Sequence, residues 1–544
     1  MAGNDIARTA PLAALALLAA GMSHSQPSGS TPHLDSTRTV ALSGQQALGL
    51  PNGVNYFGFV NTKISNTGAV AFQALLLGGN QASPFGIMRE DESLTLGPVA
   101  LSGTQAPGLP MGVTFPNLQP FPDLNMSKSG NIAFLASLIV GATGSPNTRA
   151  IFADRVGSGF SAAARVGDQA SGFAPDITFK NFNAISANDT GELAFYGTLA
   201  GPGINVANQD VIYRQLSSGD LLPLAREMEQ VPGDTPGTLW KSFNIHTDIN
   251  NGGRVAFNAT LTDELGTESF GLFSASIRND MIAHAKSGNQ APGLTAGVAM
   301  TGFSDAVLNN NNQVAFYSGL EGSGVTSSNN LALFGPGDSG LTFIAREGDQ
   351  VLSQPNGVLY DFDMSLPLIL NDQSGLALYT RLRGTTVTSS TNTAIVSTGS
   401  GTELSVVART GDQVPGLADG TVFIDISGGT LEMNNTGQVA FRAGWKMSQT
   451  ISYGLFATSP SGELVLVASP GQSIDVNNDP LITDERIISA VNSDFGFNDL
   501  GQIAFNVQFT DGSLGVFVRT IPTPSTLPLV ACIGFALRRR RSAK

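Results

Sequence analysis

The sequence predicts an all-β fold: an eight-bladed β-propeller with four short antiparallel strands per blade, whose ring is closed by pairing of the N-terminal and C-terminal strands. Three observations predict it. One pattern occurs eight times at intervals of 59 to 64 residues, which indicates a repeat architecture. Each copy holds four short apolar runs separated by Gly, Asn, Asp and Pro, as in a propeller blade. The first and last strands each lack the neighbour that the other copies provide.

The clearest stretch of the repeat reads N-x-x-G-x-V-A-F-x-A-x-L, as in residues 188–199 and 434–445. A second large apolar position follows the Phe position by four residues, and this even spacing places both on one face of a strand. Asn and Gly before the strand predict a tight turn, because Gly adopts positive φ freely. Asn312 and Ser374 occupy the Gly position in copies five and six. The Phe position holds Phe72, Phe134, Phe195, Phe257, Phe316, Leu378, Phe441 and Phe505.

The remaining strands follow in a fixed order. A stretch reading A-R-x-G-D-Q-x-P-G, as in residues 408–416, ends one strand and begins a Gly/Pro loop. A G-L-F strand, as at residues 454–456, turns through Ser461 and Gly462 into the next A-R strand, which predicts a hairpin. Between loop and turn lies a short aromatic strand. Its aromatic position holds Tyr56, Phe115, Phe179, Trp240, Met300, Tyr360 and Phe423.

The two ends of the repeat predict closure. The A-R-like strand at residues 39–42 has no preceding G-L-F strand, and the G-L-F-like strand at residues 515–518 has no following A-R strand. Their pairing would complete the last blade and remove exposed sheet edges. The alternative is an open array of β-units, but such arrays need polar capping repeats, and neither terminal copy is polar.

Both ends of the chain have the composition of targeting segments. We expect residues 1–25 to be a signal peptide, because the apolar run at 11–20 follows Arg8 and precedes small residues. Residues 36–520 form the predicted propeller domain. Residues 521–544 form a tail whose apolar stretch, 527–537, is shorter than the roughly 20 residues of a membrane-spanning helix. The following Arg538, Arg539, Arg540 and Arg541 favour the cytoplasmic side.

The tail closely resembles the PEP-CTERM sorting signal of bacterial surface proteins. Pro522 and Pro524 flank Thr523 where that signal has Glu, and the apolar stretch and arginine run match it. The tandem N-x-x-G-x-x-A-F pattern, together with both targeting segments, resembles the bacterial choice-of-anchor tandem repeat NxxGxxAF-containing proteins. The resemblance implies that an exosortase-like membrane machinery acts on the tail. It also implies an exported protein, in the cell envelope or extracellular, that is transiently anchored to the membrane through the tail.

Charge and cysteine content narrow the partners further. The formal net charge is −14, and an acidic surface repels nucleic acid. We therefore expect no nucleic-acid partner, and we expect a monomer. The only cysteine, Cys532, lies in the tail, so a chain without the tail would have no disulfide and no Cys-ligated metal.

The sequence offers little for catalysis, and we predict no catalytic residues and no cofactor. His246 and His284 lie in different copies without repeated counterparts, and no zinc-protease, serine-hydrolase or phosphate-loop motif is present. The pairs Arg165/Asp168, Arg346/Asp349 and Arg409/Asp412 recur around the ring, which favours a structural brace over a ligand site.

One loop carries a candidate metal site. Asp475, Asn477 and Asp479 have the spacing of the first oxygen ligands of a calcium loop. Pro480 and Arg486 stand where an EF-hand loop needs Gly and Glu, so a polar loop without metal is the competing interpretation.

These observations favour a non-enzymatic, exported β-propeller at the cell surface or in the extracellular matrix, which acts as a binding or scaffolding module for a surface glycan or protein ligand. An alternative is a secreted carbohydrate-active hydrolase or lyase that uses loop carboxylates. A third is a structural component of a surface layer. The sequence does not identify the ligand.

Overall fold

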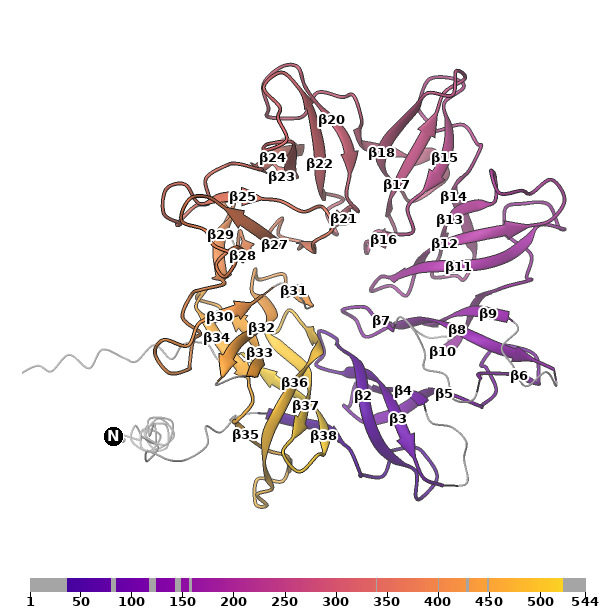
Figure 1. Ribbon diagram of the computed structural model, residues 1–544. Helices are drawn as coiled ribbons and strands as arrows, with labels where there is room; N and C mark the ends of the chain where they lie inside the picture. Colours follow the sequence, from indigo (N-terminus) through magenta and orange to yellow (C-terminus); the bar gives the residue numbers. More distant parts are fainter. Residues whose placement is uncertain are drawn as a thin grey trace, which may run out of the picture.

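The chain forms a ring of eight antiparallel sheets. The computed structural model describes residues 37–79, 85–116, 124–141, 148–155, 159–338, 340–399, 401–426, 430–447 and 450–521. Their eight four- or five-stranded sheets lie around a central axis (Figure 1). The predicted eight-bladed β-propeller is thereby confirmed.

Within each blade the strands pair in chain order, from the inner strand at the axis outwards. Blade 1 consists of β2 (Asn55–Ile64), β3 (Val70–Leu77), β4 (Phe85–Glu90) and β5 (Leu96–Leu101). Blade 2 consists of β6 (Val113–Thr114), β7 (Asn125–Met126), β8 (Ile132–Val140), β9 (Thr148–Arg155) and β10 (Gly159–Arg165). Blade 3 consists of β11 (Thr178–Ala187), β12 (Leu193–Ala200), β13 (Asp210–Gln215) and β14 (Leu221–Arg226). Blade 4 consists of β15 (Leu239–Phe243), β16 (Asp248–Ile249), β17 (Val255–Thr262), β18 (Glu268–Ala275) and β19 (Ile282–Lys286).

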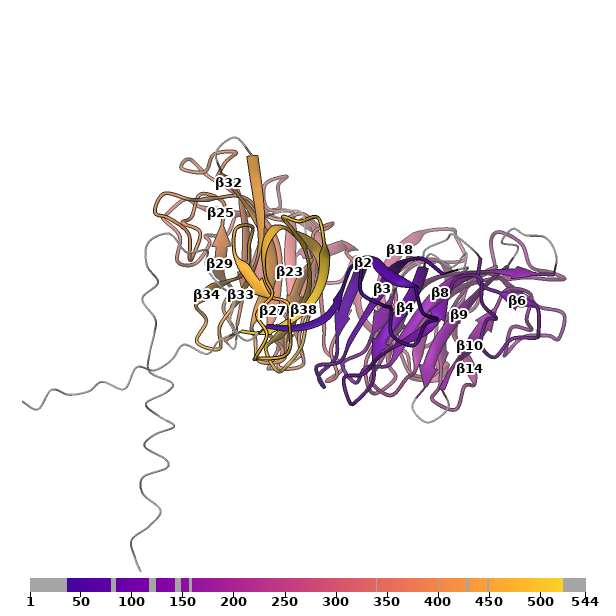
Figure 2. The ribbon, with the colours of Figure 1, turned by 90° about the horizontal axis from the view of Figure 1, so that it is seen from below.

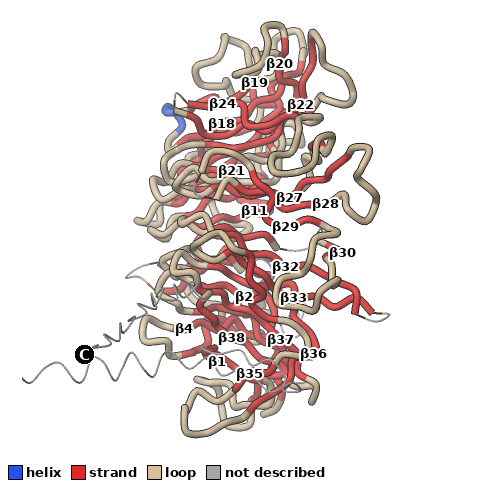
Figure 3. The backbone as a smooth tube through the Cα atoms, turned by 90° about the vertical axis from the view of Figure 1, so that its left-hand side faces the viewer, coloured by secondary structure: helices blue, strands red, loops and turns tan. Residues whose placement is uncertain are grey.

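The second half of the ring repeats this plan. Blade 5 consists of β20 (Val298–Phe303), β21 (Val307–Leu308), β22 (Val314–Gly322), β23 (Leu331–Gly337) and β24 (Gly340–Arg346). Blade 6 consists of β25 (Leu359–Asp361), β26 (Leu368–Leu370), β27 (Leu376–Arg383), β28 (Thr393–Ser397) and β29 (Ser405–Arg409). Blade 7 consists of β30 (Phe423–Asp425), β31 (Leu431–Met433), β32 (Val439–Met447), β33 (Thr450–Thr458) and β34 (Leu464–Ala468). In the described residues the only helix is the short 3₁₀ helix η1 (Arg278–Asp280), the blue segment in Figure 3.

Blade 8 is completed by the N-terminal strand. It contains β36 (Glu485–Phe497), β37 (Gln502–Phe509) and β38 (Leu514–Thr520), with β35 (Ser473–Asp475) paired to the other edge of β36. Its outermost strand is β1 (Thr37–Leu42), where Ala41 opposes Val516. The indigo β1 lies among the yellow strands of this blade in Figure 2, and beside β38 in Figure 3. The predicted closure is confirmed, and the open array is excluded.

The core lies between neighbouring blades. Alternation along a strand sends successive side chains to opposite faces of the sheet, so each second strand contributes to two cores. Phe195 packs between β11 and β13, with its ring stacked on Tyr213 at 5.3 Å, whereas Ala194 and Tyr196 pack against Trp240 of the next blade. All eight residues at the Phe position are at most 2% exposed. In blade 8, Ile488 takes the place of the aromatic residue and opposes Phe509.

The turns between the inner and second strands have the backbone conformation that the sequence predicted. Gly191 and Gly437 have φ values of +76° and +83°. Asn312 and Ser374, which replace Gly in blades 5 and 6, also lie at positive φ, +62° and +66°. The backbone conformation of this turn is therefore kept where its glycine is lost.

Candidate functional site

Eight turns meet around the axis at one end of the central channel. Each joins an inner strand to the second strand of its blade, and we call them together the turn ring. Their first residues are Ser65, Ser127, Asn188, Asn250, Asn309, Asn371, Asn434 and Asn498. Their second residues are Asn66, Lys128, Asp189, Asn251, Asn310, Asp372, Asn435 and Asp499.

In six of the eight turns the first residue is Asn, and its side chain binds its own turn and the next blade. Asn188 Oδ1 accepts hydrogen bonds from the backbone N–H groups of Thr190 and Glu192, at 3.1 and 2.9 Å. Its Nδ2 donates to the carbonyl oxygen of Asn250 in the next blade, at 2.9 Å. The same donation recurs at each successive joint from blade 3 to blade 1, at 2.8 to 3.2 Å. The Asn side chain that stabilises the turn therefore also links its blade to the next one by a hydrogen bond.

The second residues form a parallel series of bonds. The backbone N–H of Asp189 donates to Asn251 Oδ1 at 2.9 Å, and the same bond recurs at the five following joints. Where Lys128 interrupts the series, the backbone of Asn66 donates to its carbonyl oxygen at 2.7 Å. Ser129 then donates to Asp189 Oδ1 at 2.8 Å. Hydrogen bonds therefore bridge every joint of the turn ring.

The charged side chains of the turn ring are engaged in these bonds. Asp372 Oδ2 accepts from the side-chain amides of Asn310 and Asn435, both at 2.9 Å. Asp499 Oδ2 accepts from Asn66 and Asn435 in the same way, and Lys128 Nζ donates to the carbonyl oxygen of Phe497 at 2.8 Å. The ring borders a cavity of about 560 Å³, but its polar atoms serve to hold the blades together.

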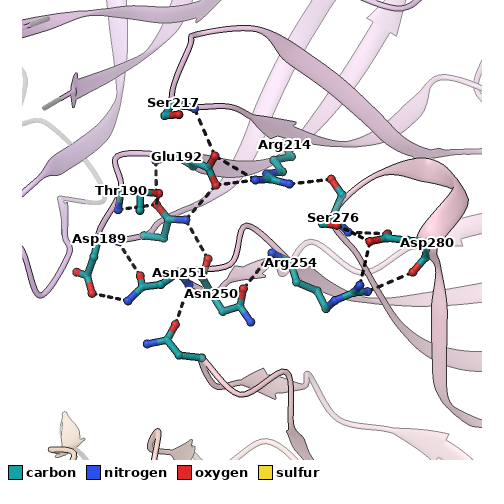
Figure 4. A network of polar contacts seen from close by, with 12 residues as sticks. Asp189, Thr190, Glu192, Arg214, Ser217, Asn250, Asn251, Arg254, Ser276 and Asp280 are labelled. Carbon is teal, nitrogen blue, oxygen red and sulfur yellow. Dashed lines mark hydrogen bonds and ion pairs between the residues drawn. The ribbon is translucent and has the colours of Figure 1, made fainter. Parts of the chain in front are cut away.

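A charged network extends the joint between blades 3 and 4 away from the axis (Figure 4). Both carboxylate oxygens of Glu192 accept from Arg214, at 3.0 and 2.9 Å, and Arg214 also donates to the carbonyl oxygen of Ser276 in blade 4. Arg254 pairs with Asp280 at 2.9 Å beside it. The bond from Arg214 to Ser276 crosses the same joint that Asn188 and Asp189 bridge, and the two ion pairs lie on either side of it, within blades 3 and 4.

The channel wall above the turn ring differs from blade to blade. The position two residues before the first turn residue lies on the inner strand or just beside it. In blades 1 to 8 it holds Lys63, Asn125, Ser186, Asp248, Val307, Ile369, Glu432 and Gly496. The first five line a cavity of about 930 Å³. Asp248 and Val307 also line the cavity at the turn ring, so the two spaces adjoin along the channel.

Three polar groups on this wall have no side-chain partner among the described residues. The side chain of Lys63 makes no hydrogen bond or ion pair there, and Ser186 Oγ is buried without a hydrogen-bond partner. Thr247, on the same wall, likewise has a buried hydroxyl oxygen without a partner. Buried polar groups in proteins are nearly always hydrogen-bonded. The Lys63 ammonium group is therefore available to a ligand, whereas the two hydroxyl oxygens are shielded from solvent and reach the cavity only if their side chains rotate.

Asp248 is the acidic group of this cavity. Burial raises the pKa of its carboxyl group, while the hydrogen bond from the Leu308 N–H and the nearby His246 oppose that rise. Part of its surface is open to the channel, yet the surrounding wall removes it from most of the solvent. His246 is exposed and lines the same cavity.

The backbone of this wall is strained at two places. Asn61 and Ala184 have φ values of +55° and +42°, and both line the 930 Å³ cavity. Each lies in a β-bulge, where the pairing register of β2 with β3, or of β11 with β12, shifts. A non-glycine residue in this region costs about 1 to 3 kcal/mol, and such residues concentrate at functional sites. Asp494 of blade 8 helps to hold Asn61 by accepting from its backbone N–H at 3.1 Å.

The predicted calcium-loop residues lie elsewhere, at the end of β35 and on the loop that follows it, at the edge of blade 8. Asp475 Oδ1 accepts from the backbone N–H groups of Asn477 and Asp484. Asn477 and Asp479 accept in the same manner from Asp479 and Leu481. These oxygens thus stabilise turns of the loop, and within the described residues no group of three or more His, Cys, Asp or Glu side chains is placed to hold a metal. Calcium binding stays a prediction.

The predicted sorting residues Pro522, Pro524, Arg538, Arg539, Arg540 and Arg541 lie outside the described residues. None of the helices that the structure describes is long and apolar enough to cross a membrane.

The repeated Arg/Asp pairs form only in part. Arg165 pairs with Asp168 at 2.8 Å. Arg346 and Arg409 instead donate their Nε–H to carbonyl oxygens of Asn329 and Thr391, in the loop that precedes the neighbouring strand. A constant side chain of the same loop is Gln: Gln413 Nε2 donates to three carbonyl oxygens, and its Oε1 accepts from the Gly420 N–H at 2.8 Å. These residues brace loops, as the repetition indicated.

Sequence reasoning did not identify Lys63, Ser186 and Asp248. Each lies outside the recurring motifs, so the search for repeated chemistry passes over them. The available signal was the position two residues before the turn, compared across all eight copies, where polar residues occupy four successive blades and then give way to Val307 and Ile369.

Comparisons with known proteins identify a family and leave the activity open. A family model described as "Family of unknown function (DUF7453)" matches residues 19–121 and 86–528. No curated protein matches the chain.

Among solved structures, a puromycin hydrolase is similar at a TM-score of 0.35 and 11% identity, over 87% of this chain and 61% of that one. The chain therefore spans less than two thirds of that enzyme's length. Polysaccharide lyase Uly1 is similar at a TM-score of 0.29 and 10% identity, over 92% of this chain and 94% of that one. A sialidase from Trypanosoma rangeli is similar at a TM-score of 0.26 and 9% identity, over 78% of this chain and 58% of that one. Similarity at this level carries no information on activity.

Proposed function

The chain belongs to the family of unknown function DUF7453, and we propose that it is an exported, surface-displayed β-propeller that binds a ligand in its central channel. The observation that carries the proposal is the contrast between two levels of the channel. The polar side chains of the turn ring are used to join the blades. Those of the wall above it, in blades 1 to 4, face a cavity of about 930 Å³ and include groups without a partner.

The hydrogen bonds of the turn ring support a binding role, because they hold the channel wall in a fixed arrangement. A ligand loses affinity when its site must become ordered on binding, and a pre-organised site avoids that cost. Hydrogen bonds across every joint hold the inner strands in position before any ligand arrives. A rigid frame with variable side chains on its inner wall is suited to recognition.

Export and display rest on the two ends of the chain. Residues 1–25 have the composition of a signal peptide, and residues 521–544 resemble a PEP-CTERM signal on which an exosortase-like machinery acts. The display proposal is tested by deleting residues 521–544 in a bacterium that carries such machinery. We expect release of the protein from the cell envelope into the medium; retention equal to that of the full chain would contradict it.

The binding proposal is tested by filling the channel. The full-length protein is applied to an array of bacterial surface glycans and of peptides, beside a Val307→Trp variant whose indole occupies the 930 Å³ cavity. A Leu265→Trp variant serves as control, because Leu265 is 91% exposed on a loop. We expect at least one ligand that the wild type and the control bind and Val307→Trp does not.

Two outcomes would contradict the binding proposal. Ligand binding that is the same in all three proteins would place the site outside the channel. Turnover of an arrayed glycan by the wild type, lost on substitution of a single loop carboxylate, would favour the alternative of a carbohydrate-active hydrolase or lyase.

A further inference from the structure

The charges of the 930 Å³ cavity specify a class of ligand, an inference that rests on the proposed binding function. We propose that the channel takes a zwitterion, namely a short peptide with both termini free. Its carboxylate lies at Lys63 and its ammonium group lies at Asp248.

The two charged groups are placed to hold opposite ends of one ligand. Lys63 belongs to the inner strand of blade 1 and Asp248 to that of blade 4, and both line the same cavity. Lys63 has no ion-pair partner among the described residues, so a ligand carboxylate would be its counter-ion. Charge-assisted hydrogen bonds of this kind are among the strongest polar contacts.

Asp248 is suited to an ammonium group. Its Oδ2 already accepts the Leu308 N–H at 2.9 Å, which fixes the carboxyl group on the wall. Lys63 and His246 are the other titratable groups that line the cavity, and His246 lies on the same blade as Asp248. A cation on the channel side would offset the burial that disfavours the charged carboxylate.

The wall between the two charges matches a peptide backbone. In the order of the blades, Lys63 is followed by Asn125, Ser186 and Asp248. Asn125 carries an amide that has interactions of its own within the protein, and the hydroxyl of Ser186, which lacks a partner among the described residues, would meet a ligand after rotation of its side chain. Peptide N–H and C=O groups need such donors and acceptors when they leave water. Val60, Leu124 and Val307 also line the cavity and offer apolar surface to small side chains.

An acidic glycan fits these groups less well. It would bring a second negative charge beside Asp248 and offer nothing positive to that carboxylate, and a like charge at an interface is costly. In addition, the described side chains that line the cavity include no Phe, Tyr or Trp ring on which a sugar could stack. An extended tripeptide spans roughly 10 Å, and the cavity of about 930 Å³ leaves room for its side chains and for water.

The test pairs changes in the ligand with changes in the protein. Calorimetric titrations of the full-length protein use trialanine, N-acetyl-trialanine, which lacks the ammonium group, and trialanine amide, which lacks the carboxylate. We expect trialanine to bind, and each blocked peptide to bind at least about tenfold more weakly.

Two variants assign each end of the peptide to its residue. Lys63→Met should weaken trialanine binding at least about tenfold yet leave the affinity for trialanine amide unchanged, because the lost charge pair is already absent. Asp248→Asn, which keeps an oxygen to accept the Leu308 N–H, should behave likewise toward N-acetyl-trialanine. Lys446→Met and Asp220→Asn are the matched controls, since both residues are exposed away from the channel, and thermal unfolding confirms that all four variants are folded.

The outcomes separate this inference from the proposed function. Equal affinity for the free and blocked peptides, absence of saturable trialanine binding, or binding that Lys63→Met leaves unchanged would each overturn the zwitterion assignment. If a trisaccharide of galacturonic acid bound instead and Val307→Trp abolished it, the channel would remain a binding site while the peptide assignment failed. If the array also gave no channel-dependent ligand, both proposals would fall.

Discussion

The pKa of His284 is lowered by its surroundings in the folded protein. His284 lies on β19, and its Nε2 is 2.8 Å from Ser274 Oγ. Burial, and to a lesser degree the nearby Arg254, lowers the pKa of its imidazole from 6.5 to about 4. Because folding lowers this pKa, the unfolded chain takes up the proton first as the pH falls. His284 therefore makes folding less favourable as the pH decreases from about 6.5 to 4.

The first prediction follows from this shift. Between pH 7 and pH 5 the free energy of unfolding of the wild type should fall by about 2 kcal/mol more than that of His284→Gln, since Gln keeps a hydrogen-bonding group but does not titrate. Urea unfolding at both pH values measures the difference. Parallel pH profiles for the two proteins would show that His284 is protonated without penalty in the folded state.

At the scale of single residues, the sequence was informative wherever a position recurs. The Phe positions and the aromatic positions are buried as predicted, because their period identifies the face of the strand that meets a core. Trp240 and Trp445 are core residues for the same reason. Single residues such as Asp248 have no such period, and their role depends on which other blades share their cavity.

Among the elements, the turn between inner and second strand joins neighbouring blades through hydrogen bonds. Asn434 is fully buried; its Oδ1 accepts the backbone N–H groups of Thr436 and Gln438, and its Nδ2 donates to Asn498 in the next blade. The sequence predicted the turn and its positive φ from Asn and Gly. The bond to the next blade could not be predicted, because its acceptor lies one whole repeat further along the chain and becomes a neighbour only in the closed ring.

Asn434→Ala tests this element. We expect it to lower stability by about 2 to 4 kcal/mol, because two backbone N–H groups and one carbonyl oxygen lose a buried partner. Asn434→Ser is the matched control that blade 2 provides, where Ser127 Oγ accepts the Asn131 N–H at 3.2 Å. It should lose less, by about 1 to 2 kcal/mol, because serine keeps one of the two N–H bonds within the turn, while the other N–H bond and the bond to the next blade are removed. Equal losses, measured by chemical unfolding, would mean that the bond within the turn contributes nothing.

At the scale of the whole molecule, the repeat builds the frame and departures from it build the site. Eight copies of one blade, tied by the turn ring, predict the architecture almost completely, including the strand that closes the ring. The cavity was not predictable in the same way. It arises from bulges at Asn61 and Ala184 and from side chains that differ between blades, and neither follows from the shared pattern.

Ring closure by β1 is the central claim, because the channel exists only if the first and last blades meet. Thr37 and Arg519 are directly opposed across β1 and β38, a spacing that permits a disulfide. In a Cys532→Ser background, the double variant Thr37→Cys/Arg519→Cys should therefore form one intramolecular disulfide in the native protein and unfold at a higher denaturant concentration than its reduced form. Two free thiols in the oxidised native protein, or cross-linking only between separate chains, would contradict closure by the N-terminal strand.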